Sequence, residues 1–139
     1  SDLNDHTPEG FANILSYLKT TLTDNGKMIC VFGCGGDRDK FKRPLMSKEV
    51  SKYCDFAIIT NDNPRYENPK RIIADILEGI SIEHDVVEDR YGAILQAVNM
   101  TKKSDTLVIL GKGAENYQEM NGRYYPFNDV EVLKKYLKQ

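Results

Sequence analysis

The order of apolar segments along the 139 residues predicts an α/β fold: a Rossmann-like, three-layer domain with a mostly parallel sheet of about six strands. Two observations carry this prediction. Short β-branched runs at 28–32, 56–60 and 106–110 alternate with segments of helical periodicity, as expected for parallel strands that helices cover on both faces. Asn121-Gly122 lies between two short polar and aromatic segments and predicts a tight hairpin turn. The hairpin would add one antiparallel strand at an edge of the sheet.

Helices are predicted between these strands from apolar spacing and from capping residues. Thr7-Pro8 is typical of a helix start, and so is Asn68-Pro69. Asp89 precedes a further helix, and Asn128 with Glu131 three residues later forms a variant capping box for the last one. Apolar spacing alone predicts a helix at 44–53 and a weak strand at 86–87.

Each of the three later helices has an apolar face that we expect to pack on the sheet. The faces are taken from residues that recur at helical spacing. They are Ile72, Ile73, Ile76, Leu77 and Ile80 in the first, Tyr91, Ile94, Leu95 and Val98 in the second, and Val130, Leu133 and Leu137 in the third.

Composition limits the classes of partner. The chain has 19 basic and 21 acidic residues and a net charge of −2, so it has no excess of positive charge for nucleic acid or an anionic membrane. No apolar run approaches the roughly 18 residues of a membrane span. The first residues lack the basic-then-apolar pattern of a secretory signal. We therefore expect one cytoplasmic domain, residues 1–139, that binds neither nucleic acid nor membrane.

The three cysteines, Cys30, Cys34 and Cys54, show no CxxC spacing. Two of them lie in or beside a predicted strand, where cysteine acts as a small apolar side chain. The two histidines, His6 and His84, are isolated. We expect reduced thiols in the core and no metal site.

Three loops follow the three clearest strands: 33–39, 61–67 and 111–118. In a parallel sheet such loops leave the same edge, so we expect them to face one crevice. Glycine turns decorated by solvated charges would give the same pattern, and this interpretation stays open. The loops together carry both signs of charge, as a zwitterionic ligand requires, in Arg38, Asp62, Asn63, Arg65, Lys112 and Glu115.

The loop Asp62-Asn63-Pro64-Arg65 is the most informative of the three. A guanidinium binds a carboxylate or phosphate through two parallel hydrogen bonds, which an ammonium cannot do. By contrast, Gly33-Cys34-Gly35-Gly36 has Arg38 where a dinucleotide-binding fingerprint has its third glycine. No phosphate-binding loop of the form G-x-x-x-x-G-K-[ST] occurs in the chain. A small anionic or zwitterionic ligand is therefore favoured over a nucleotide.

These motifs, taken in order, resemble the C-terminal domain of Mur ligases, especially those that add meso-diaminopimelate. The resemblance runs from Pro8 onward and rests on the segments 31–39, 42–46, 62–65 and 111–118. It implies a three-domain enzyme of which this chain is the third, amino-acid-binding domain. The N-terminal UDP-binding domain and the central ATPase domain would be absent from this chain.

The resemblance also implies the reaction and its cofactors. The family forms an acyl phosphate on the substrate carboxylate, which the amine of the incoming amino acid attacks to give an amide. ATP and Mg²⁺ would be bound mainly by the central domain. UDP-N-acetylmuramoyl-L-alanyl-D-glutamate would bind through the other domains. We expect no catalytic residue and no metal ligand in this chain, which alone should be inactive.

The resemblance assigns ligand contacts by motif position. Arg65 would pair with the distal carboxylate of meso-diaminopimelate, Glu115 would bind an ammonium group, and Arg38 with Asn63 would complete carboxylate binding. His6 would lie on the nucleotide side. The family usually has an aspartate where Leu3 stands and a histidine where Ala114 stands. The full set implied for the amino acid is Arg38, Asp62, Asn63, Arg65, Gly111 and Glu115.

Two alternatives remain open at this point. One is the third domain of another ligase of the wider superfamily, such as a folylpolyglutamate synthase, against which the 62–65 loop argues. The other is a free-standing module that binds an amino acid or muropeptide without catalysis. A phosphate-binding domain upstream in the parent reading frame would favour the ligase.

Overall fold

The computed structural model describes residues 7–112 and 115–137, in which there are five helices and six strands. Three predicted N-caps are confirmed, because the side chains of Thr7, Asn68 and Asn128 accept hydrogen bonds from main-chain N–H groups of the following helical turns. Asp89, which was predicted only to precede a helix, caps α4 in the same way. In chain order the elements are α1 (Pro8–Thr20), β1 (Met28–Phe32), α2 (Lys42–Tyr53), β2 (Phe56–Ile59), α3 (Pro69–Leu77), β3 (Glu83–Val86), α4 (Arg90–Met100), β4 (Thr106–Leu110), β5 (Tyr117–Met120), β6 (Arg123–Pro126) and α5 (Asp129–Leu137).

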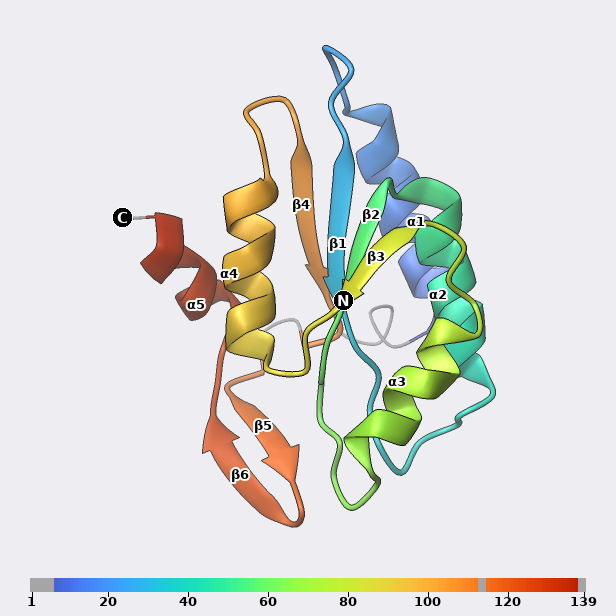
Figure 1. The fold of residues 1–139 in the computed structure, drawn as a ribbon, viewed down its shortest axis with the longest axis vertical. Helices are drawn as coiled ribbons and strands as arrows, with labels where there is room; N and C mark the ends of the chain where they lie inside the picture. Colours follow the sequence, from blue (N-terminus) through green and yellow to red (C-terminus); the bar gives the residue numbers. More distant parts are fainter. Residues whose placement is uncertain (1–6, 113–114, 138–139) are drawn as a thin grey trace.

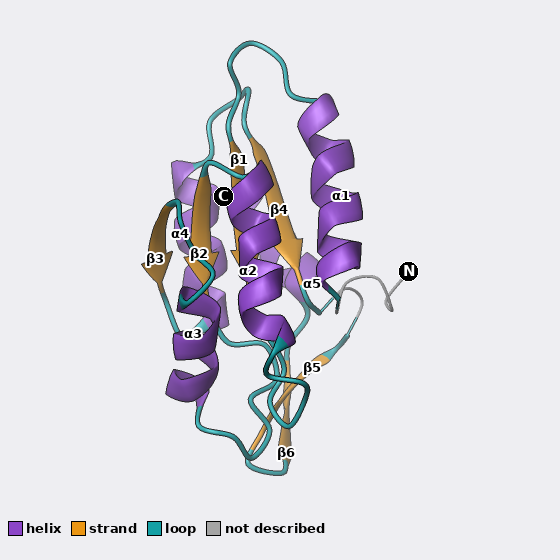
Figure 2. Cartoon of the chain, turned by 90° about the vertical axis from the view of Figure 1, so that its right-hand side faces the viewer, coloured by secondary structure: helices purple, strands orange, loops and turns teal. Residues whose placement is uncertain are grey.

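Four strands form a parallel sheet in the order β3-β2-β1-β4. Helices α1, α2 and α3 cover one face, and α4 and α5 cover the other (Figures 1 and 2). The predicted three-layer α/β fold is therefore confirmed. All four strands point the same way, so the loops that leave their carboxyl ends gather at one end of the molecule, beside β5 and β6 (Figure 1).

The hairpin does not join this sheet. The prediction of one six-stranded sheet with an antiparallel edge was wrong, because β5 and β6 pair only with each other as a separate antiparallel sheet. The turn itself is confirmed, since Asn121 and Gly122 have φ of 52° and 76°. Its position follows from other bonds: the N–H of Arg65 donates to Glu119 O at 2.9 Å, and that of Asn121 donates to Arg65 O at 2.7 Å. These bonds fix the hairpin to the loop after β2, away from the edge of β4.

The central strand β1 supplies both halves of the core. Cys30 and Phe32 face α1, α2 and α3, whereas Ile29 and Val31 face α4 and α5. This alternation follows from the two-residue period of a strand. All three cysteines are free and buried, as predicted. No helix in the described part of the chain is long and apolar enough to cross a membrane.

Two helices are rotated relative to the apolar faces predicted for them. Leu95 in α4 is 37% exposed, while in α5 Val130 is 47% and Leu137 66% exposed. A buried ion pair decides the rotation, because Arg90 of α4 and Asp129 of α5 both point inward and lie 2.7 Å apart. An apolar-spacing argument treats both residues as surface groups and so misplaces the face. Ile94 is buried as predicted, and Tyr91, Val98 and Leu133 pack partly buried against the core. The buried residues that were not predicted are Arg90, Ala93 and Ala97 in α4, and Asp129, Val132 and Tyr136 in α5.

Candidate amino-acid site

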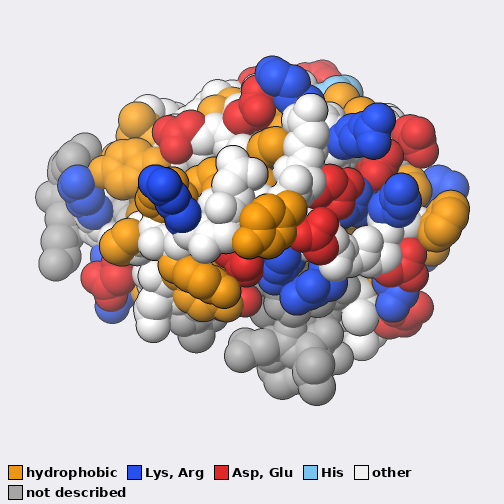
Figure 3. Space-filling view, turned by 90° about the horizontal axis from the view of Figure 1, so that it is seen from below, with side chains coloured by type: hydrophobic (Ala, Val, Ile, Leu, Met, Phe, Trp, Pro, Cys, Tyr) orange, Lys and Arg blue, Asp and Glu red, His pale blue; other side chains and the backbone are white. Residues whose placement is uncertain are grey.

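The loops after β1, β2 and β4 meet at the carboxyl end of the sheet and enclose a cavity of about 290 Å³. Seen from that end, the surface carries acidic and basic side chains close together (Figure 3). Five of the six residues expected to bind an amino acid line the cavity, and Gly111 does not. The lining residues are Gly33, Cys34, Gly35, Arg38, Asp39, Lys42, Arg43, Met46, Asp62, Asn63, Arg65 and Glu115.

Glycines allow these loops to approach each other closely. A Cβ on Gly33 would collide with the carbonyl of Thr60, and a Cβ on Gly36 would collide with that of Pro64. The N–H of Gly36 donates to Asn63 O at 2.8 Å, which ties the loop after β1 to the loop after β2. The glycine run after β1 therefore has a packing function here.

Gly111 supports the site from behind. Its φ is +115°, a conformation that L side chains rarely adopt, and a Cβ there would lie 2.8 Å from Asp62 Oδ2. Any larger residue would strain the backbone and press on the Asp62 carboxylate. Gly111 thus leaves room for the Asp62 carboxylate, although it does not itself line the cavity.

Arg65 is held in an uncommon backbone conformation, with φ of 54°. Its Nη1 donates to Gly36 O at 2.9 Å, and its Nε lies 3.2 Å from Glu119 Oε1. Among residues 7–112 and 115–137, no hydrogen-bond partner is found for Nη2. One side of the guanidinium is therefore fastened to the protein, and the other keeps N–H groups for a ligand.

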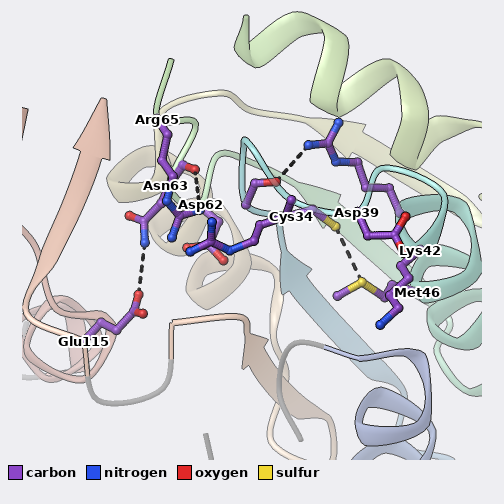
Figure 4. Close-up of a pocket in the computed structure, with 12 residues that line it drawn as sticks. Cys34, Asp39, Lys42, Met46, Asp62, Asn63, Arg65 and Glu115 are labelled. Atoms are coloured by element: carbon purple, nitrogen blue, oxygen red, sulfur yellow. Dashed lines mark hydrogen bonds between the residues drawn. The ribbon is translucent and has the colours of Figure 1, made fainter. Parts of the chain in front are cut away.

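Asn63 and Glu115 face each other across the cavity wall (Figure 4), where Asn63 Nδ2 donates to Glu115 Oε1 at 3.2 Å. The other end of the amide, Oδ1, accepts hydrogen bonds from Lys112 Nζ at 2.7 Å and from the N–H of Glu119 at 2.8 Å. Because Oδ1 faces two donors and Nδ2 faces an acceptor, the oxygen and nitrogen of the amide cannot exchange places without losing these hydrogen bonds. Asn63 therefore presents N–H groups toward the cavity.

Asp62 is 3% exposed and lines the cavity. Its Oδ1 is buried and makes no hydrogen bond in the described structure, although Lys112 Nζ lies 3.3 Å away. A buried carboxylate oxygen without a hydrogen-bond donor costs free energy. Among the described residues the cation at this oxygen is the Lys112 ammonium, which lies behind the cavity.

Lys112 is placed differently from the other charged residues of the three loops. Its side chain is 0% exposed and does not line the cavity. Burial lowers the pKa of Lys112, and the nearby Asp62 carboxylate opposes that shift. The sequence grouped Lys112 with the ligand-facing charges, whereas the structure places it behind them.

Arg38 lies at the exposed rim, where its Nη1 donates to its neighbour's carbonyl, Asp37 O, at 3.2 Å. The loop that carries it is fastened by Glu67, whose Oε1 accepts from the N–H of Asp37 at 3.1 Å. Arg43 donates two hydrogen bonds to Glu67, at 2.7 and 2.8 Å, and one to Gly35 O at 2.9 Å. Hydrogen bonding from Arg43 lowers the pKa of Glu67 to about 2.

The sequence analysis did not predict that Arg43 and Glu67 fasten the loop that carries Arg38. The two lie 24 positions apart, and spacing gives no signal that they meet. Arg90 and Asp129 were missed for the same reason, although Arg90 also donates to the carbonyl of Asn61 at 3.1 Å, next to the site. Only the tertiary structure reveals these anchoring residues.

Two sulfur-containing side chains, Cys34 and Met46, also line the cavity. Cys34 Sγ lies 3.9 Å from Met46 Sδ (Figure 4). Burial first, and then the Asp62 carboxylate, raise the pKa of Cys34 to about 12, so it remains a protonated thiol. His6 and Ala114 lie outside the described residues. In the part of the chain that is described, no group of three acidic, histidine or cysteine side chains is arranged to hold a metal ion.

Comparison with known proteins identifies the family. The profile described as "Mur ligase, glutamate ligase domain" matches residues 4–113. The chain belongs to the Mur ligase family. The resemblance inferred from the motifs is thereby confirmed.

Two curated relatives of this Mur ligase domain share one name. It is 49% identical over 134 residues to the UDP-N-acetylmuramoyl-L-alanyl-D-glutamate--2,6-diaminopimelate ligase of Aquifex aeolicus, a match that covers 95% of this chain and 27% of the relative. The protein of the same name from Caldanaerobacter subterraneus is 48% identical over 135 residues, covering 95% and 28%. The chain thus spans about a quarter of the length of these relatives.

A solved structure agrees with the sequence comparison. It is described as the structure of a UDP-N-acetylmuramoyl-L-alanyl-D-glutamate--2,6-diaminopimelate ligase, and it superposes with a TM-score of 0.90 at 39% identity. The match covers 96% of this Mur ligase domain and 28% of the solved chain. Nearly the whole of the present fold therefore occurs within a longer ligase.

Proposed function

We propose that this chain is the C-terminal, amino-acid-binding domain of an ATP-dependent ligase. The ligase would add meso-diaminopimelate to UDP-N-acetylmuramoyl-L-alanyl-D-glutamate in peptidoglycan precursor synthesis. The names of relatives at 48–49% identity support the proposal. The observation that carries it is the free side of Arg65, in a cavity that the carboxylates of Asp62 and Glu115 also line.

Diaminopimelate has an amino-acid centre at each end of its chain. One amine would attack the acyl phosphate, and the other end, with its own carboxylate and ammonium, would be held in the cavity. The free N–H groups of Arg65, with Asn63 Nδ2 and Arg38, suit the carboxylate. The carboxylates of Asp62 and Glu115, both of which line the cavity, suit the ammonium. Lysine has no distal carboxylate, so it would leave Arg65 without a partner.

The remaining parts of the reaction would belong to other domains of the parent protein. A central domain would bind ATP and Mg²⁺, and an N-terminal domain would bind the UDP-sugar. The contribution of the present chain would be to hold the amine in position, an effect that can contribute several kcal/mol. The reaction would take place in the cytoplasm, where ATP is available. The 139 residues alone would neither hydrolyse ATP nor form an amide.

The proposal is tested by Arg65→Ala and Arg65→Lys in the full-length ligase. Arg65→Ala should cost about 2–4 kcal/mol in kcat/KM for diaminopimelate, because a buried carboxylate loses a bidentate partner. Activity with lysine should change little, so the preference between the two amino acids should narrow. Arg65→Lys should recover only part of the loss, since an ammonium keeps the charge but not the fork.

Arg71→Ala is the matched control, because Arg71 is exposed on α3 and its side chain makes no hydrogen bond or ion pair within the described residues. It should behave like the wild type. An Arg65→Ala enzyme that discriminates between diaminopimelate and lysine as well as the wild type would show that Arg65 only shapes the loop. The substrate assignment would then lose its main support.

A further inference from the structure

Lys112 Nζ lies at the centre of the network that underlies the cavity. It donates to Asn63 Oδ1 at 2.7 Å and to Tyr117 O at 2.8 Å. It also lies 3.3 Å from Asp62 Oδ1 and 3.7 Å from Glu115 Oε1. A single buried ammonium therefore contacts three side chains that line the cavity, those of Asp62, Asn63 and Glu115.

Burying a lysine side chain is unfavourable unless its ammonium has strong partners. Desolvating an ammonium costs free energy that its ion pairs often do not fully recover, and an apolar side chain of similar size commonly packs as well or better. Tyr117 contributes a main-chain carbonyl, and its ring centroid lies 6.0 Å from Lys112 Nζ, at the outer limit of a cation–π contact. The ionic partners of the ammonium are the carboxylates of Asp62 and Glu115, and Asn63 accepts a hydrogen bond from it.

We propose that Lys112 is a positioning residue of the amino-acid pocket, which orients Asp62, Asn63 and Glu115 from behind and does not touch the substrate. This inference rests on the proposed function. Lys112 can only donate hydrogen bonds, so it holds Asn63 Oδ1 inward and turns Nδ2 toward Glu115 and the cavity. It also lies between two carboxylates that would otherwise repel each other. In this way it keeps both available for one ammonium group of the substrate.

The test uses the full-length ligase with Lys112→Met, which removes every donor, and Lys112→Gln, which keeps an uncharged donor. Lys112→Met should raise the KM for diaminopimelate about tenfold to a hundredfold, since Asn63 and Asp62 lose their partner. The kcat should fall much less. Lys112→Gln should recover part of the affinity. Lys103→Met, at an exposed lysine distant from the cavity, is the control and should match the wild type.

Loss of folding gives a different pattern of results. If Lys112 only stabilises the fold, Lys112→Met reduces the fraction of active enzyme, so kcat falls while KM for the remaining enzyme is unchanged. That result would overturn the inference. The same variant in an Asn63→Ala background adds a second measurement. Measured as the change in KM, a positioning lysine loses part of its effect there, whereas a lysine that only stabilises the fold leaves KM unchanged in both backgrounds.

The inference can fail separately from the proposed function. The wild-type enzyme first shows which amino acid it adds, and a preference for one other than diaminopimelate would refute the proposed substrate. The KM comparison is then made with the amino acid that the enzyme uses. A raised KM in Lys112→Met would still support positioning, and an unchanged KM would still exclude it.

Discussion

Arg65 Nε and Glu119 Oε1 lie 3.2 Å apart, and both side chains are 16% exposed. The same two residues are joined through the main chain, where the N–H of Arg65 donates to Glu119 O. The N–H of Glu119 donates in turn to Asn63 Oδ1, and Gln118 Nε2 donates to Asp62 O at 2.8 Å. Strand β5 therefore holds the loop after β2 along its whole polar segment.

The ion pair with Glu119 should keep the Arg65 guanidinium in the plane that suits a carboxylate. In the full-length ligase, Glu119→Ala should reduce the preference for diaminopimelate over lysine by about fivefold, the size expected for a partly exposed ion pair. Glu119→Gln should have a smaller effect, because its amide oxygen can still accept from Nε. The measurement is the ratio of kcat/KM for the two amino acids.

Glu119 could instead act on Arg65 through its charge alone, and this gives the opposite result. If Glu119 mainly offsets the charge of Arg65, both substitutions will strengthen binding of the substrate carboxylate. An increased preference for diaminopimelate in both variants would therefore show that Glu119 does not position Arg65. Glu131→Gln, at an exposed position of α5, is a suitable control.

Removing one partner of the buried pair Arg90–Asp129 should destabilise the domain strongly. Arg90 donates to both carboxylate oxygens of Asp129 at 2.7 Å, and to the carbonyls of Asn61 and Leu110 at 3.1 and 3.2 Å. Arg90→Met should lower the free energy of unfolding by about 3–5 kcal/mol, because it leaves a buried carboxylate unpaired. Urea denaturation of the 139-residue chain measures this.

A second substitution separates two contributions to the lost free energy of unfolding: the unpaired Asp129 carboxylate and the lost packing of the Arg90 side chain. Arg90→Met with Asp129→Leu removes both charges, and it should be more stable than Arg90→Met alone. If the double variant is no more stable than the single one, the unpaired carboxylate is not the cause of the loss.

Glu67 should make the free energy of unfolding depend on pH. Its pKa is lowered to about 2, chiefly by hydrogen bonding from Arg43, so folding favours the charged form. The resulting stability is fully present above the ordinary pKa of about 4.5 and is lost as the pH falls from there through about 2. The loss should be about 1–2 kcal/mol, since the carboxylate is 21% exposed and partly screened by water.

Thermal unfolding at a series of pH values measures this contribution. Glu67→Gln should be less stable than the wild type at pH 6, and the difference should shrink steadily toward pH 2. Glu88→Gln removes an exposed ion pair with Lys70 and is the control. A Glu67→Gln curve that stays parallel to that of the wild type from pH 6 to pH 2 would contradict the prediction.

Local sequence signals predicted most of the fold. Capping at Thr7, Asn68, Asp89 and Asn128 needs only neighbouring residues, and the Asn121-Gly122 turn needs only a backbone that accepts positive φ. The three clearest strands were visible because apolar runs covered on both faces carry no charged residue. The meeting of their loops followed from parallel strand direction alone.

Tertiary structure decided what local signals cannot encode. Whether the hairpin paired with β4 or with the loop after β2 depended on hydrogen bonds between Arg65 and Glu119, 54 positions apart. The rotation of α4 and α5 depended on Arg90 meeting Asp129, and the inward direction of Lys112 depended on Asn63. By itself the sequence determined the elements and the loops that form the site. Which charges face the cavity and which support it from behind is a matter of pairing and burial, and these exist only once distant segments are in contact.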